Sequence, residues 1–112
     1  MDIAENQILE TLLPYLKKVR EDPVPSRADE FGLPGFSLED LVGRTISGIK
    51  EIENPLPYNP EVSSPNPEKF KVIIFKDGSY LLHMNVGWND GSTLHTFLVE
   101  NSRVRYSYLL YD

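Results

Sequence analysis

The C-terminal part of the chain, from Glu68 to Asp112, contains no proline and is divided by short turn signals. Two runs rich in β-branched and aromatic residues, Phe70–Phe75 and Tyr80–Val86, flank the pair Asp77-Gly78. Such a pair between two apolar runs is among the strongest short-range signals for a β-hairpin, because both central residues of the turn need a positive φ. The sequence therefore predicts that this region begins with an antiparallel hairpin.

Two further turn signals extend this hairpin. Asp90-Gly91 precedes the run Leu94–Val99, and Asn101-Ser102 precedes Val104–Tyr111. Residues 70–111 are thus predicted to form a four-stranded antiparallel meander. Residues 44–53 are predicted to add a fifth strand, although their apolar positions also fit a helical stripe.

Two-residue turns would set the register of the meander and assign each side chain to one face. The expected cross-strand pairs are Phe75 with Tyr80, Val86 with His95, and Phe97 with Tyr106. One face is strongly apolar and is expected to carry Ile73, Phe75, Tyr80, Leu82, Met84, Val86, Trp88, Phe97, Val99, Val104, Tyr106, Tyr108 and Leu110. This face is predicted to pack against an N-terminal helix.

The opposite face of the meander mixes apolar and polar side chains. It is expected to carry Phe70, Val72, Ile74, Leu81, Leu94, Leu98 and Leu109 together with His83, Asn85, Thr96, Arg105 and Ser107. Two rows across the strands are predicted, one of Asn85, Thr96 and Ser107 and one of His83, Leu98 and Arg105. A half-solvated sheet face, a surface for a partner and a shallow ligand pocket all fit this mixture.

Residues 1–21 are predicted to form the helix that covers the apolar face. Ile8, Leu12, Leu16 and Val19 recur at helical spacing, with acidic residues early and basic residues late in the segment. Pro14 lies inside the pattern, where it removes a backbone hydrogen bond. We therefore expect a kink there, or two short helices that meet near residues 11–13.

The central third of the chain is dominated by proline and glycine. Residues 22–43 are predicted to be irregular and to lie against the domain through Phe31, Leu33 and Phe36, with a short helix that starts at Ser37 and ends near Val42. Residues 54–69 contain five prolines and are predicted to form a loop. Altogether, residues 1–112 are expected to be a single α+β domain, a kinked helix packed on a four- to five-stranded antiparallel sheet.

Charge and composition limit the classes of partner. The chain has 17 acidic residues against 11 lysines and arginines, a net charge of −6, which opposes the approach of nucleic acid or an anionic membrane. It has no cysteine, which excludes disulfides and thiolate metal sites. No apolar run reaches membrane-spanning length and the N-terminus lacks a signal-peptide pattern, so a soluble, cytoplasmic protein is expected.

No motif for catalysis or cofactor binding is present, and we expect neither a metal nor a cofactor. With two-residue turns, the two histidines, His83 and His95, are predicted to point to opposite faces of the sheet. A bulge in the turn would place them on one face but roughly 7 Å or more apart, so neither geometry provides a shared metal site. His83 beside Arg105 is the one catalytic candidate, as a general base.

The sequence favours a non-catalytic protein–protein interaction or regulatory module. The partner would be another protein or a second copy of the chain, bound through Leu81, His83, Asn85, Leu94, Thr96, Leu98, Arg105, Ser107 and Leu109. The alternative is a domain that binds, or acts on, a small molecule at the same sheet face around His83 and Arg105.

Overall fold

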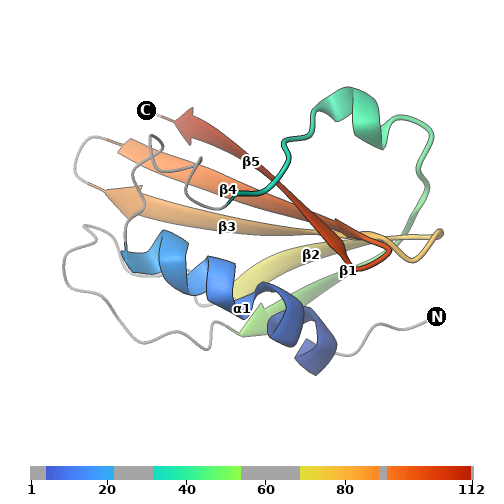
Figure 1. Cartoon of the computed structure of the whole chain (residues 1–112), viewed down its shortest axis with the longest axis horizontal. Helices are drawn as coiled ribbons and strands as arrows, with labels where there is room; N and C mark the ends of the chain where they lie inside the picture. The colour runs from blue at the N-terminus through green and yellow to red at the C-terminus, as the bar shows by residue number, and fades with distance from the viewer. Residues whose placement is uncertain (1–4, 22–31, 54–68, 89–90, 112) are drawn as a thin grey trace.

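A five-stranded antiparallel sheet, with helix α1 lying against one of its faces, forms the body of the protein (Figure 1). The computed structural model describes residues 5–21, 32–53, 69–88 and 91–111. The elements are α1 (Glu5–Glu21), the short 3-10 helix η2 (Leu38–Leu41), β1 (Ile46–Glu53), β2 (Lys69–Phe75), β3 (Tyr80–Trp88), β4 (Gly91–Glu100) and β5 (Arg103–Tyr111). Each strand pairs with its neighbour in sequence, in the order β1-β2-β3-β4-β5. The predicted α+β fold is confirmed, with residues 46–53 as strand rather than helix.

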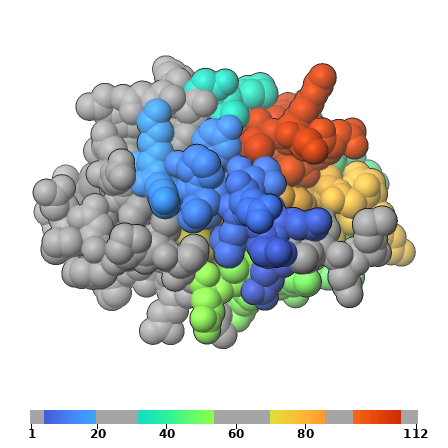
Figure 2. Space-filling model, turned by 60° about the horizontal axis from the view of Figure 1, so that its bottom comes forward, coloured from blue at the N-terminus to red at the C-terminus, as the bar shows by residue number. Residues whose placement is uncertain are grey.

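Helix α1 runs without interruption through Pro14, so the alternative of two short helices is wrong, while the kink stays a prediction. The proline is exposed, which keeps its ring out of the core. The apolar stripe faces the sheet, where Ile8, Leu12, Leu16 and Val19 are completely buried. Figure 2 shows α1 lying across this face of the molecule, with β1 along its lower side.

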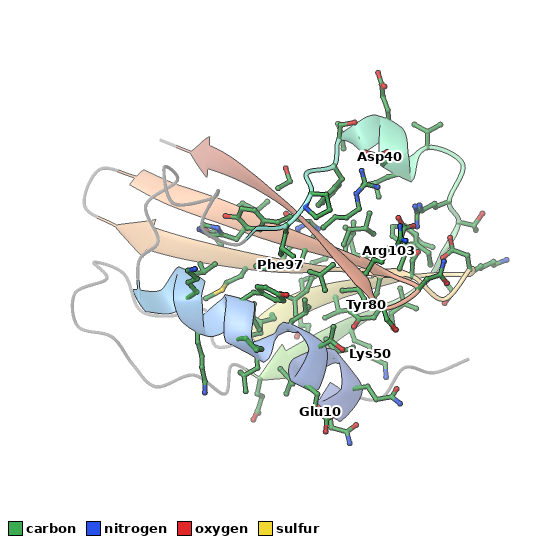
Figure 3. The ribbon with its side chains drawn as sticks, viewed as in Figure 1. Glu10, Asp40, Lys50, Tyr80, Phe97 and Arg103 are labelled. Atoms are coloured by element: carbon green, nitrogen blue, oxygen red, sulfur yellow. The ribbon has the colours of Figure 1, made fainter. Side chains whose placement is uncertain are left out.

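The sheet supplies the rest of the core under α1. Its buried members are Ile52, Phe70, Val72, Ile74, Tyr80, Leu82, Met84, Phe97, Val99 and Tyr106. Phe97 points from β4 toward α1 (Figure 3), and its ring lies 6.1 Å from that of Tyr15 and 5.1 Å from that of Tyr106. The facing predicted for β3, β4 and β5 is therefore confirmed for these residues.

Strand β2 presents the opposite side chains to those predicted. Phe70, Val72 and Ile74 face α1, whereas Ile73 and Phe75 lie on the other side of the sheet. The cause is the turn between β2 and β3, which has three residues rather than two. Gly78 N–H donates to the Phe75 carbonyl at 3.0 Å, and Phe75 N–H donates to the Ser79 carbonyl at 2.9 Å.

One extra residue in this turn shifts the register of β2 against β3 by one position. Ile74 thus pairs with Tyr80, in place of the predicted pair of Phe75 with Tyr80. Because side chains alternate along a strand, a shift of one residue moves every side chain of β2 to the opposite face. Gly78 has φ of 92° and occupies the left-handed position that closes a three-residue hairpin loop.

The next two turns keep the predicted faces. Trp88 pairs with Gly91, so Val86 lies opposite Thr93 and Met84 opposite His95. The predicted pair of Val86 with His95 is wrong by two positions, which preserves the alternation. At the third turn Asn101 and Ser102 both have positive φ, and Phe97 pairs with Tyr106 as predicted.

We predict that Gly78→Ala lowers the free energy of unfolding by about 1–2 kcal/mol, because its φ is one that L-residues adopt at a cost. An added Cβ would meet no atom within 4 Å, so the loss would come from backbone conformation alone. Gly48→Ala is the matched control: its Cβ also meets nothing within 4 Å, and its φ is not positive. Urea denaturation of both variants checks this, and equal stabilities for the two would contradict it.

Candidate functional site

The face of the sheet opposite α1 is partly covered by the chain itself. A second apolar cluster is formed there by Phe75, Leu81 and Leu98, with Ile73, Phe36 and Leu41 packed against it. Phe36 and Leu41 come from residues 32–41, which pass over β5 and end in η2 on this side (Figure 1). The prediction that this segment lies against the domain is confirmed for Leu33 and Phe36, while Phe31 lies outside the described residues.

Backbone contacts attach the segment to the outer edge of β5. Tyr106 N–H donates to the Pro34 carbonyl at 3.0 Å, and Gly35 forms a parallel bridge with Tyr106. Ser37 is the N-cap of η2, and its N–H donates to Asp40 Oδ2 at 2.8 Å. This backbone hydrogen bond is the main cause that holds the pKa of Asp40 below its usual value, and Arg105 adds to it.

Arg105 ties the segment to the sheet. Its Nη2 donates to the Gly35 carbonyl at 2.9 Å and to Asp40 Oδ2 at 3.2 Å, and its Nη1 lies 3.6 Å from Glu100 Oε1. The side chain is three-quarters buried. These contacts direct the guanidinium toward residues 35–40, the segment that it anchors.

Arg44 makes a second attachment just after η2. It donates to Glu100 Oε2 at 2.6 Å, to Ser79 Oγ at 2.8 Å and to the Asp40 carbonyl at 3.1 Å. Glu100 therefore bridges both arginines, and Figure 3 shows η2 with Asp40 on the side of the sheet away from α1. The ion pairs of Arg44 and Arg105 are partly exposed to water, and a single pair of this kind contributes little to stability. The segment is therefore held by the network of these contacts rather than by one strong contact.

A pocket of about 380 Å³ lies between this segment and strands β3, β4 and β5. Its apolar walls are Phe36, Leu38, Leu41, Leu81 and Leu94. Its polar side chains are Ser37, His83, Thr96 and Ser107. Five of the predicted surface residues, Leu81, His83, Leu94, Thr96 and Ser107, are thus brought together in one concave site.

His83 is the titratable side chain of the pocket. Its Nδ1 is hydrogen-bonded to Thr96 Oγ1 at 3.0 Å, and the side chain is partly buried. Burial lowers the pKa of His83, and the charge of nearby Lys71 lowers it further. The imidazole is therefore neutral at pH 7, with one ring nitrogen as donor and the other as acceptor.

The remaining predicted surface residues have different positions. Leu98 is completely buried beneath the segment, Arg105 is its anchor, and Asn85 is exposed beyond the pocket. The side chain of Leu109 lies outside the described residues.

The predicted rows across the sheet are wrong because of the two-position shift between β3 and β4. The observed rows are His83 with Thr96 and Ser107, Leu81 with Leu98 and Arg105, and Asn85 with Leu94 and Leu109.

The second histidine belongs to the core under α1. His95 is buried, its Nδ1 is hydrogen-bonded to the Tyr106 hydroxyl, and the two rings stack with centroids 5.8 Å apart. His83 and His95 therefore point to opposite faces, as predicted. The backbone of His95 pairs with that of Tyr108.

Sequence reasoning did not find the half of the pocket contributed by the segment. The residues of this half are far from β3–β5 along the chain; they are Phe36, Ser37, Leu38 and Leu41. Arg44, which helps to hold the segment, was predicted only as the first residue of a strand. The one available signal was an aromatic residue, Phe36, in a segment otherwise typical of a linker. It indicates burial but does not identify the face against which the segment packs.

We predict that the NMR titration midpoint of His83 lies below that of an exposed histidine, about 6.5. Because the native state resists protonation, the unfolded state binds more protons in this range, and the free energy of unfolding falls as pH drops below about 6.5. Lys71→Gln should raise the midpoint, since it removes the smaller of the two causes. Lys76→Gln removes the same charge from the exposed hairpin turn and is the control. A midpoint at or above 6.5 in the unmodified protein would contradict the prediction.

The described residues contain neither a candidate metal-binding group nor a candidate membrane-spanning helix. Within residues 5–21, 32–53, 69–88 and 91–111, no group of three or more His, Asp or Glu side chains is placed to hold a metal ion. None of the helices in the described part of the chain is long and apolar enough to cross a bilayer. No family model, curated protein or solved structure matches this chain.

Proposed function

We propose that this protein is a non-catalytic module that binds another protein through the face of its sheet opposite α1. The observation that supports this most directly is the position of its exposed apolar side chains. Among the described residues, Leu38 (82% exposed), Val42 (81%), Ile46 (53%) and Ile49 (57%) are the large apolar side chains that are more than half exposed. All four lie within twelve consecutive residues of the chain.

The four side chains border the second cluster from two directions. Ile46 pairs with Phe75 and Ile49 with Ile73, and both partners belong to or pack against that cluster. Leu38 and Val42 lie at the beginning of η2 and directly after its end, beside Leu41. We call these four residues the apolar rim. Grouped apolar surface of this kind is typical of an interface with another protein.

The position of β1 adds to this argument. It is the last strand on its side of the sheet, so one side of its backbone has no partner strand among the described residues. Ile46 and Ile49 lie on this strand and are accessible to an approaching chain. A partner that contacts them would bury apolar area where the sheet itself ends.

Charge limits which partner fits. The chain carries a net charge of −6, so a second copy would bring six further negative charges to the interface. A partner with an apolar patch surrounded by lysine and arginine would be attracted instead. We therefore assign the apolar rim to a basic protein rather than to self-association.

A catalytic role has less support. His83, the candidate general base, is hydrogen-bonded to a threonine hydroxyl rather than to a carboxylate that would raise its basicity. Arg105, its proposed companion, is engaged with Gly35, Asp40 and Glu100.

We predict that Val42→Lys combined with Ile49→Lys reduces capture of the partner at least tenfold. Each substitution places a charge at an exposed apolar position, which should leave the fold intact but repel a basic partner. The control is Asn6→Lys combined with Gln7→Lys, which adds the same charge at exposed positions of α1. Quantitative affinity capture from source cells compares the three proteins, and calorimetry with the purified captured protein then gives Kd at two salt concentrations.

Selective loss in the rim variant, with weaker binding at high salt, supports the proposal. Equal capture by all three proteins, or no partner for the unmodified protein, overturns it. A concentration-dependent dimer in sedimentation, abolished by the rim variant alone, would replace the basic partner with a second copy.

A further inference from the structure

The pocket under η2 is lined mostly by residues outside the apolar rim and shares only Leu38 with it. Its volume of about 380 Å³ lies within the range of small-molecule sites in proteins, at the lower end. A cavity of about 150 Å³ in another protein is large enough to bind benzene. The pocket under η2 therefore has room for a compound with about two rings.

Three of the four polar side chains of the pocket, His83, Thr96 and Ser107, come from one row across the sheet, and the fourth, Ser37, comes from the covering segment. His83 pairs with Thr96, and Thr96 pairs in turn with Ser107, so the three side chains are neighbours on adjacent strands. The bond to Thr96 uses His83 Nδ1, which leaves Nε2 as a donor or acceptor for another group. Three polar side chains thus lie together on the sheet side of the pocket, while the covering segment contributes mostly apolar side chains, Phe36, Leu38 and Leu41, besides Ser37.

None of the described residues that line the pocket carries a charge at pH 7, and Lys71, whose charge reaches His83, lies on β2 outside this lining. The neighbouring arginines, Arg44 and Arg105, are held by Glu100 and Asp40 outside its lining. Burial and Lys71 keep His83 in its neutral form. An ion that enters such a site loses part of its hydration and gains no counter-charge from the lining, so it binds less favourably than an uncharged molecule.

We infer that this pocket binds a small uncharged molecule, mostly apolar, with one hydrogen-bonding group directed at His83, Thr96 and Ser107. A hydroxyl, carbonyl or amide on a compound of about two rings fits this description. The inference goes beyond the proposed protein partner and does not depend on it. Leu38 belongs to both sites, so a bound ligand would contact one residue of the apolar rim.

A matched set of three probes tests the chemistry. 2-Naphthol has two rings and one uncharged hydroxyl, naphthalene lacks the hydroxyl, and 2-naphthoate carries a negative charge on the same rings. In calorimetric titrations at pH 7.5, 2-naphthol should bind about threefold to tenfold more tightly than naphthalene, as expected for one hydrogen bond. 2-Naphthoate should bind more weakly than 2-naphthol, and the NMR signals of His83 should shift on addition of 2-naphthol.

Two variants locate the binding. Thr96→Val removes a hydroxyl at similar volume and should weaken 2-naphthol binding while leaving naphthalene binding unchanged. Ser107→Leu fills part of the pocket and should weaken the binding of both probes. The rim variant, Val42→Lys with Ile49→Lys, should bind 2-naphthol as the unmodified protein does, which separates this inference from the proposed function.

The inference is overturned if 2-naphthol does not bind at millimolar concentration, or if 2-naphthoate binds as tightly as 2-naphthol. It is also overturned if Ser107→Leu, shown to be folded by its circular dichroism spectrum, binds both probes normally. Loss of 2-naphthol binding in the rim variant alone would move the site from the pocket to the rim.

Discussion

The turn at Gly78 controls how the two faces of the sheet are populated. Its positive φ allows the chain to reverse in three residues, and this length determines which side chains of β2 face α1. With Phe70, Val72 and Ile74 on that side, the core under the helix is complete. Ile73 and Phe75 consequently lie on the opposite face, where they start a second cluster that residues 32–41 cover.

Because of this second cluster, the face of the sheet opposite α1 is partly covered by the chain instead of being open to solvent. The covering segment is held by Phe36 and Leu41 packing on the sheet and by the two arginines that share Glu100. Arg44 and Arg105 are used for attachment, and the described residues that line the pocket beneath η2 carry no charge at pH 7, since His83 is neutral there. The same contacts that hold the segment therefore determine which ligands the pocket can accept.

The two proposed binding sites, the apolar rim and the pocket, use adjoining parts of the sheet face opposite α1. The apolar rim extends from η2 to the edge strand β1, while the pocket lies toward β4 and β5. Leu38 is common to both.

Local patterns in the sequence were enough to predict the helix, the strands and the order of the meander. Helical spacing identifies Ile8, Leu12, Leu16 and Val19 as the buried stripe, and Asn101-Ser102 specifies a two-residue turn with two positive φ values. These features depend on neighbouring residues alone. Five residues of the pocket could also be assigned to one face, because β3, β4 and β5 alternate regularly.

Only the tertiary structure decided the facing of β2, the burial of Leu98 and the engagement of Arg105. Asp77-Gly78 is compatible with turns of two or three residues, and a difference of one residue inverts a whole strand. The sequence by itself determined the helix, the strands and their order, since each follows from residues close together in the chain. The pocket depended on packing between residues 36–41 and strands β3–β5, a long-range contact that no local pattern specifies.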